Sequence, residues 1–236
     1  HLMHGAEYDE MVEAIDNYKD KFESVAIAEP MLGEVGDDAT VINDDKKAVA
    51  QAITDEACKE AGYDSMEAAA EDGTAFVFMG HGTSHTANVT YDQMQTQMED
   101  LGFTNAFIGT VEGEPEDTAC EEVIAKVKDA GFKKVVLRPL MVVAGDHANN
   151  DMAGDDEDSW KSQFEASGAF DSVDCQIEGL GRIAAVEDLY VAHTKDAIDS
   201  LGTADDAAEV TDDTEEASDD AAAEETTDDA ADTTDY

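Results

Sequence analysis

Two histidines in this sequence each follow a short apolar run that ends in small residues. The run at residues 75–79 (AFVFM) is followed by a glycine and His81, and the run at residues 135–143 is followed by Ala-Gly-Asp and His147. Such runs, bounded by turn formers, are typical of strands that are buried on both faces. Imidazole is a ligand for divalent transition metals and also a general base. The two histidines are therefore candidates for binding a cation or for moving protons.

A third apolar run, at residues 106–111, ends at Glu112, and several carboxylates, Asp151 among them, follow His147. Ligands bind to parallel α/β sheets at the carboxyl ends of the strands, so we expect His81, Glu112 and His147 to meet at that edge. Their separation in sequence is too long for a local zinc finger, so the site would be formed by tertiary structure. A solvated surface loop is the simpler interpretation of any single histidine, but the recurrence of the pattern weakens it.

Longer motifs surround these residues: GHGTSHTAN, VEGEPE and RPLMVVAGDHANNDMAGDDEDSWK. With these motifs the chain from His1 to Ser200 resembles the anaerobic, class II sirohydrochlorin cobaltochelatases of cobalamin biosynthesis. The third motif is long and specific enough to make a chance match an unsatisfactory explanation. The resemblance implies a three-layer α/β fold with a parallel sheet. It also implies that part of the amino-terminal half of that fold precedes His1.

The resemblance implies roles for individual residues. In that family a His, a Glu and a second His hold the metal above the tetrapyrrole, and by motif these are His81, Glu112 and His147. We expect the two histidines to be catalytic proton acceptors as well as metal ligands. A further functional Glu of the family falls on Glu7 of HLMHGAEY, which we assign to substrate binding or catalytic proton transfer. His85 is either a substrate-binding residue that supports the site or a polar residue at a helix start.

The implied reaction is insertion of a divalent metal, Co²⁺ ahead of Fe²⁺ or Ni²⁺, into sirohydrochlorin or a related tetrapyrrole, with no organic cofactor. Two pyrrole N–H protons must leave as the metal exchanges its ligands for ring nitrogens, so proton acceptors are needed beside the metal. Two rival functions stay open. A non-catalytic haem or metal carrier on the same scaffold would bind without turnover, and a metal-independent α/β binding module would bind no metal.

The chain is strongly acidic, because 59 Asp and Glu residues against 13 Lys and Arg residues give a formal net charge of −46. This charge argues against nucleic acid binding, which needs clustered basic residues, and against anionic membrane surfaces. It also leaves Arg138 and Arg182 among the few candidates to pair with a carboxylate-rich tetrapyrrole. Residues 201–236 are almost entirely Ala, Thr, Asp and Glu, so we expect a disordered acidic tail after one chelatase-like domain at residues 1–200. Removal of residues 202–236 should leave folding and metal binding nearly unchanged.

Periodicity predicts the elements that position these residues. Apolar residues recur at helical spacing in residues 8–22, 46–61, 88–101, 116–130 and 183–201, and short strands are predicted at residues 24–28 and 173–177. A further helix should begin near Asp158. Its Trp160 either floors a tetrapyrrole pocket or packs a helical turn against the sheet. His193, in the middle of the last helix, is expected to be structural or exposed and therefore dispensable.

Three cysteines, Cys58, Cys120 and Cys175, are widely spaced and odd in number. We expect small buried apolar residues there, and neither a disulfide framework nor a paired-cysteine metal site. No apolar run approaches the ~20 residues that cross a bilayer, and no signal peptide is evident. We therefore expect a cytoplasmic protein. An exported form stays open because the native amino terminus is not seen, and so does a homo-oligomer.

Overall fold

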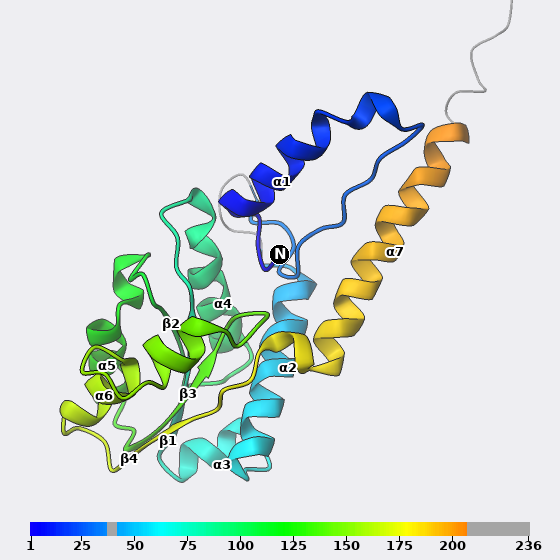
Figure 1. Ribbon diagram of the computed structural model, residues 1–236. Helices are drawn as coiled ribbons and strands as arrows, with labels where there is room; N and C mark the ends of the chain where they lie inside the picture. Colours follow the sequence, from blue (N-terminus) through cyan, green and yellow to red (C-terminus); the bar gives the residue numbers. More distant parts are fainter. Residues whose placement is uncertain (37–41, 207–236) are drawn as a thin grey trace, which may run out of the picture.

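Four parallel strands form one sheet in this computed structural model, which describes residues 1–36 and 42–206 apart from the side chains of residues 202–206. The strands are β1 (Thr74–Gly80), β2 (Ala106–Thr110), β3 (Lys134–Pro139) and β4 (Ser172–Cys175), in the order β2-β1-β3-β4. The connections between them are helical, with α4 (Val89–Asp100), α5 (Cys120–Asp129) and α6 (Trp160–Ala166) in turn. The prediction of a parallel α/β fold is confirmed (Figure 1).

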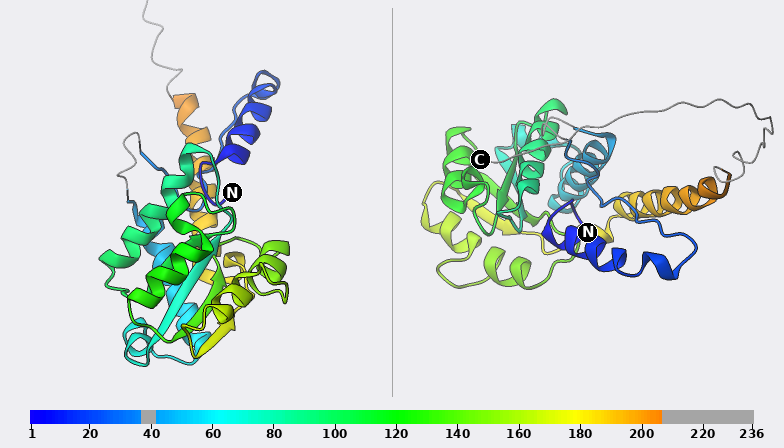
Figure 2. Two further views of the ribbon diagram at one scale, coloured as in Figure 1. Left: turned by 90° about the vertical axis from the view of Figure 1, so that its left-hand side faces the viewer. Right: turned by 90° about the horizontal axis from the view of Figure 1, so that it is seen from above.

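Helices cover both faces of the sheet and so produce three layers (Figures 1 and 2). On one face, α2 (Asp44–Ala61), α3 (Met66–Glu71), α4 and the start of α7 (Ala184–Asp206) pack over Phe76 and Phe78. On the other face, α5 and α6 pack over Val77, Val135 and Leu137. Successive side chains of a strand point to opposite faces. Both faces of β1 and β3 are therefore largely buried, as the apolar run of β1 and the apolar run of β3, interrupted only by Arg138 and Pro139, predict.

The strand order creates a topological switch point between β1 and β3. From β1 the chain crosses to β2 on one side, and the next connection passes back to β3 on the other side. Parallel pairing of Met79 with Pro139 brings the carboxyl ends of β1 and β3 side by side. A crevice at such a point is where open α/β sheets bind ligands. The two segments that follow these strands carry His81 and His147.

The helix ends follow local sequence signals. The side chain of Asn43 caps α2 by accepting a hydrogen bond from the backbone N–H of Lys46, and Gly62 ends α2 with a positive φ of 83°. α7 has 23 residues and continues beyond the predicted end at Leu201 to Asp206. Neither α7 nor any other described helix is long and apolar enough to cross a membrane. The rest of the expected acidic tail, residues 207–236, lies outside the described residues.

Four predicted elements differ from the structure. Residues 24–28 form no strand, because no described strand pairs with their backbone groups. α1 (Ala6–Asp16) stops well before Phe22, which is 64% exposed. β3 ends at Pro139 instead of Val143, and the chain then bends, because Val143 finds no place in the core and is 73% exposed. The predicted strand at 173–177 also ends sooner, at Cys175.

The three cysteines are free and mostly buried. Desolvation raises the pKa of Cys58 to about 11, of Cys120 to about 12 and of Cys175 to about 11. Thiols with such pKa values carry almost no thiolate at neutral pH, and the thiolate is the reactive form. Cys58 and Cys120 are buried as predicted, whereas Cys175 is only partly buried.

Candidate metal and substrate site

His81, Glu112 and His147 lie at the carboxyl edge of the sheet, around the switch point. His81 follows β1, Glu112 follows β2, and His147 begins a π-helical turn, η4 (His147–Met152), after β3. The imidazole rings of His81 and His147 meet edge to face, with centroids 4.7 Å apart and planes at 81°. Oε1 of Glu112 lies 4.0 Å from Nε2 of His81. Three separate strand ends therefore deliver these side chains to one place.

The separation of the His81 and His147 rings is close to that of two imidazole ligands to one ion. With metal–ligand bonds of ~2.1 Å, neighbouring donor atoms lie roughly 3–3.5 Å apart and two imidazole centroids roughly 5 Å apart. The centroids of His81 and His147 meet this condition, whereas the Nε2–Oε1 distance to Glu112 is somewhat too long. Within residues 1–36 and 42–206, no group of three or more His, Cys, Asp or Glu side chains is placed closely enough to hold a metal ion as it stands. The side chains of His81 and Glu112 are 52% and 53% exposed, so they have room to turn toward a shared ion.

Hydrogen bonds fix the backbone around His81. The N–H of Glu112 donates to the carbonyl of His81 over 2.9 Å, which ties the ends of β1 and β2 together. Gly82 adopts a φ of +94°, and a Cβ there would lie 2.9 Å from the Cβ of Glu112, so only glycine fits. Nδ1 of His81 lies 2.8 Å from the carbonyl oxygen of Gly82, to which it donates in the Nδ1–H tautomer. The free nitrogen, Nε2, then faces Glu112.

Tyr91 is a supporting residue that periodicity alone did not reveal. The sequence places it on the apolar side of the helix that follows His81, and it is indeed only 2% exposed. Its hydroxyl also accepts the N–H of Gly82 over 2.9 Å and so supports the loop that carries His81. Burial raises the pKa of the phenol, so it stays neutral. One signal in the sequence could have identified this role. A tyrosine stands at a core position that a phenylalanine would fill equally well, so its hydroxyl is expected to form a hydrogen bond.

Asp151 is a second supporting residue. Its Oδ2 lies 2.5 Å from Nδ1 of His147, and the two side chains are 45% and 39% exposed. The sequence shows Asp151 only as one of several carboxylates after His147. A spacing of four residues within one helical turn places two side chains on the same side, and this is the signal that could have identified the pair.

Glu7 shares a cavity with His81. A small cavity of about 130 Å³ separates the start of α1 from the loop after β1, and Glu7 and His81 both line it. The other lining residues are His1, Leu2, Met3, Gly5, Gly82, Thr83 and Tyr91. A group bound in this cavity would lie next to both Glu7 and His81.

His85 occupies a helix start. Its Nδ1 accepts the N–H of Ala87 over 3.1 Å and so caps the short 3₁₀ helix η2 (Thr86–Asn88). Its Nε2 lies 3.2 Å from Oδ2 of Asp9 on α1. These contacts match the helix-start alternative. They also connect the loop after β1 to the helix that carries Glu7.

The two arginines do not offer free cations to a substrate. Arg138 is fully buried on β3, and its Nη1 donates to Glu60 and to Gln176 over 2.7 Å each. The expectation that Arg138 could pair with a carboxylate-rich tetrapyrrole is therefore wrong, because the guanidinium lies inside the protein. Arg182 is exposed, and its Nε is 3.0 Å from Oε1 of Glu178.

Trp160 packs against the sheet and does not floor a pocket. It is 3% exposed, and its ring fills the space above Gly109 of β2, where a Cβ would lie 2.4 Å from the indole. Phe164, one turn later on α6, stacks on it with centroids 6.0 Å apart. The alternative of a helical turn packed on the sheet is the one that the structure bears out.

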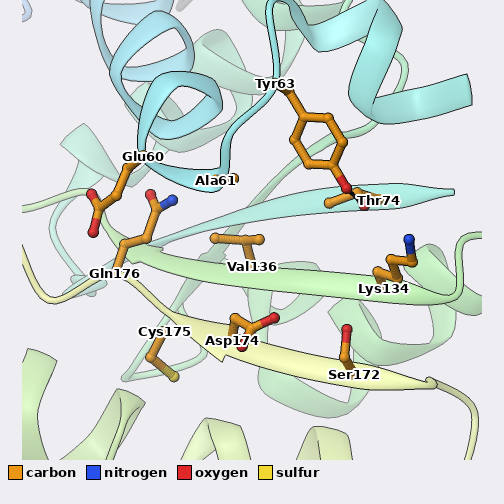
Figure 3. Close-up of a pocket in the computed structure, with 10 residues that line it drawn as sticks. All are labelled: Glu60, Ala61, Tyr63, Thr74, Lys134, Val136, Ser172, Asp174, Cys175 and Gln176. Atoms are coloured by element: carbon orange, nitrogen blue, oxygen red, sulfur yellow. Dashed lines mark hydrogen bonds between the residues drawn. The ribbon is translucent and has the colours of Figure 1, made fainter. Parts of the chain in front are cut away.

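A separate polar cavity of about 330 Å³ lies over β3 and β4, away from the histidines (Figure 3). Its walls include Tyr63, Thr74 and Lys134. The hydroxyl of Tyr63 donates to Asp72, and Lys134 forms an ion pair with the same carboxylate over 2.7 Å. None of the residues expected at the metal or substrate site lines this cavity.

Comparison with known proteins gives these features a family context. The family model described as Cobalt chelatase (CbiK) matches residues 1–199. The sirohydrochlorin cobaltochelatase of Salmonella typhimurium is 32% identical over 198 residues, which are 84% of this chain and 66% of that protein. The sirohydrochlorin cobaltochelatase CbiKC of Nitratidesulfovibrio vulgaris is 29% identical over 205 residues, which are 85% of this chain and 64% of that protein. The chain thus spans slightly less than two thirds of the length of these relatives.

Proposed function

Because this chain belongs to the cobalt chelatase family, we propose that it inserts Co²⁺ into sirohydrochlorin or a closely related tetrapyrrole. The observation that carries the proposal is the meeting of His81, His147 and Glu112 at the switch point of the sheet. Two imidazoles and a carboxylate suit Co²⁺, and they also suit Fe²⁺ and Ni²⁺. The names of the two curated relatives favour cobalt among these ions.

In the proposed site, Nε2 of His81, Nε2 of His147 and the carboxylate of Glu112 hold the incoming ion. Three protein ligands leave coordination positions free for ring nitrogens, so the ion can change partners without first returning to water. The three side chains are between 39% and 53% exposed, which leaves the ion accessible to a flat macrocycle. A deeply buried site would bind the metal but could not release it to the ring.

The reaction breaks two pyrrole N–H bonds and forms bonds from the metal to the ring nitrogens, so two protons leave for each divalent ion. We assign their acceptance to His81 and His147, because each Nε2 regains a free lone pair as the ion departs. Glu112 offsets the positive charge that develops beside them. Glu7 contributes substrate binding and proton transfer from the cavity beside His81. His85 contributes to substrate binding by holding the helix that carries Glu7.

The test is an anaerobic assay of Co²⁺ insertion into sirohydrochlorin, followed through the visible absorption of the macrocycle, with Fe²⁺ and Ni²⁺ as parallel arms. We expect metal-dependent conversion that requires His81 and His147. Stable binding of a tetrapyrrole without conversion would instead support the carrier function. Absence of both tetrapyrrole and metal binding would overturn the proposal in favour of a metal-independent binding module.

A further inference from the structure

The two histidines of the proposed site use their second ring nitrogen differently. Nδ1 of His81 faces a neutral partner, the carbonyl of Gly82, at 2.8 Å. Nδ1 of His147 faces a carboxylate, that of Asp151, at 2.5 Å. In both cases a proton on Nδ1 leaves Nε2 unprotonated, with a lone pair that can bind a metal ion. Only His147, however, has an anion behind it.

The backbone of η4 determines this contact. The turn has π-helical hydrogen bonding, a conformation that is rare and often found at functional sites. Ala148 and Met152 are fully buried, so the apolar side of the turn is anchored in the core. The side-chain Nδ2 of Asn149 donates a hydrogen bond to the carbonyl of Gly145 over 2.7 Å and closes the start of the turn. With the turn held in this way, His147 and Asp151 share its open side.

We propose that Asp151 is a positioning residue that orients His147 and strengthens its Nε2 as a metal donor. This inference rests on the proposed function, because it assigns Asp151 a task only if His147 binds the ion. A carboxylate that accepts the Nδ1 proton selects one tautomer, fixes the orientation of the ring and raises the basicity of the opposite nitrogen. His147 is then the stronger and His81 the weaker imidazole ligand. This difference in ligand strength would let the ion break its bond to His81 before its bond to His147.

The experiment compares Asp151→Ala and Asp151→Asn with Asp155→Ala as the matched control. Asp155 is a carboxylate of the same segment, but it is 98% exposed and contacts Lys161 instead of a histidine. The readouts are Co²⁺ affinity, the visible spectrum of bound Co²⁺, and the ¹⁵N shifts of His147 in the metal-free protein. The ¹⁵N shifts identify the ring tautomer without any metal.

We expect Asp151→Ala to weaken Co²⁺ binding by ~10–100-fold, as loss of the partner of a metal-bound histidine does elsewhere. The cobalt spectrum should change, and the His147 ring should no longer favour the Nδ1–H tautomer. Asp151→Asn should retain the tautomer, because its amide oxygen still accepts the proton, and should recover part of the affinity. Asp155→Ala should match the wild type in all three readouts.

The outcomes separate the two proposals. If the wild type binds no Co²⁺, the proposed function fails, while the tautomer measurement still decides whether Asp151 controls the ring. If the wild type binds Co²⁺ and Asp151→Ala binds it equally well with an unchanged spectrum, the inference about Asp151 is overturned. If Asp151→Ala does not fold, the Co²⁺ affinity and cobalt spectrum of Asp151→Asn test the inference instead. If both equal those of the wild type, the inference is overturned as well.

Discussion

The rings of His81 and His147 meet edge to face, 4.7 Å between centroids, although they belong to segments that follow different strands of the sheet. Nothing in either segment alone specifies this contact. It arises because β1 and β3 are neighbours in the sheet and their connections leave in opposite directions at the switch point. The perpendicular rings also avoid the crowding that two stacked imidazoles would meet around one ion.

His147→Ala should abolish Co²⁺ insertion and lower Co²⁺ affinity by more than the ~10–100-fold expected for loss of a supporting residue. The substitution removes one ligand and one proton acceptor from the same point. The fold should persist, because the side chain is 39% exposed and its loss opens no core cavity. Isothermal titration with Co²⁺ and circular dichroism check the two statements. Near-normal insertion by this variant would contradict the assignment of His147.

His193→Ala should lower the free energy of unfolding by about 1 kcal/mol and leave Co²⁺ affinity unchanged. His193 is less dispensable than its place in the middle of the last helix suggests. Its Nδ1 lies 3.1 Å from the carbonyl oxygen of Glu29, and its Nε2 lies 3.3 Å from Oδ1 of Asp45, so it connects α7 to two other segments. Urea unfolding and cobalt titration on the same sample measure both effects. A loss of cobalt binding would show that the metal site extends toward α7.

Tyr91→Phe should weaken Co²⁺ binding and cost about 1–3 kcal/mol of stability, because the Gly82 N–H loses its acceptor inside the protein. The ring itself is retained, so no cavity forms. Tyr63→Phe is a suitable control, since it also removes a hydrogen-bonded hydroxyl but lies by the separate polar cavity. Thermal unfolding and cobalt titration of both variants distinguish a general loss of stability from a specific effect on the His81 loop. Equal cobalt affinities of Tyr91→Phe and wild type would remove Tyr91 from the supporting residues.

Lys46 should make stability rise with pH in the range just below its ordinary pKa. Its ammonium is fully buried and donates to the carbonyls of Leu32 and Glu34 over 2.9 and 2.6 Å. Burial lowers the pKa of Lys46, with Asp45 and Glu34 opposing part of the effect. At pH values between this lowered pKa and the unfolded value of about 10.4, the Lys46 side chain is protonated in the unfolded chain and neutral in the folded chain. The free energy of unfolding therefore increases with pH through that window, and the cost of burying the charge is present in full below it.

Lys46→Met supplies the reference for this prediction, because it removes the titrating group while keeping an unbranched apolar chain. The difference in unfolding free energy, wild type minus variant, should shift in favour of wild type as the pH rises through the range just below the unfolded pKa of about 10.4. Urea titrations at several pH values measure it, and all other titrations cancel in the difference. A constant difference over this range would mean that Lys46 keeps its ordinary pKa in the folded protein.

Added salt should lower the KM for sirohydrochlorin. The chain carries a net charge of −46, Arg138 is buried, and Arg182 is already paired, so an anionic macrocycle approaches a surface of like charge. Raising the ionic strength to ~0.3 M shortens the screening length below the ~10 Å of 0.1 M salt and reduces this repulsion. Initial rates at several KCl concentrations test the direction, with potassium sulfate as a check for specific anion effects. A KM that rises with salt would reveal a local basic patch for the substrate.

Local patterns predicted the features that depend on neighbours in sequence. The apolar runs and the small residues after them identified β1, β2 and β3, and the residues that follow were expected at one sheet edge. Features that depend on distant partners were not predictable in this way. Residues 24–28 have a strand-like pattern, but no strand in the described part of the chain pairs with them. Arg138 is paired with residues from α2 and from the segment after β4. The hydroxyl of Tyr91 shows the same limit, because periodicity reports that a side chain is buried and says nothing of its hydrogen bond.

The placement of Trp160 gives the molecule a built-in optical reporter. It is the single tryptophan of the chain. Trp160 begins α6, the next helix after η4, and its buried ring packs against Gly109 of β2. Tetrapyrroles absorb light in the region where tryptophan emits, so a macrocycle seated at the sheet edge would quench this fluorescence by energy transfer without touching the indole. Unfolding would instead expose the indole to water and shift its emission to longer wavelength. One unlabelled chain would thus report tetrapyrrole binding through emission intensity and the integrity of its fold through emission wavelength.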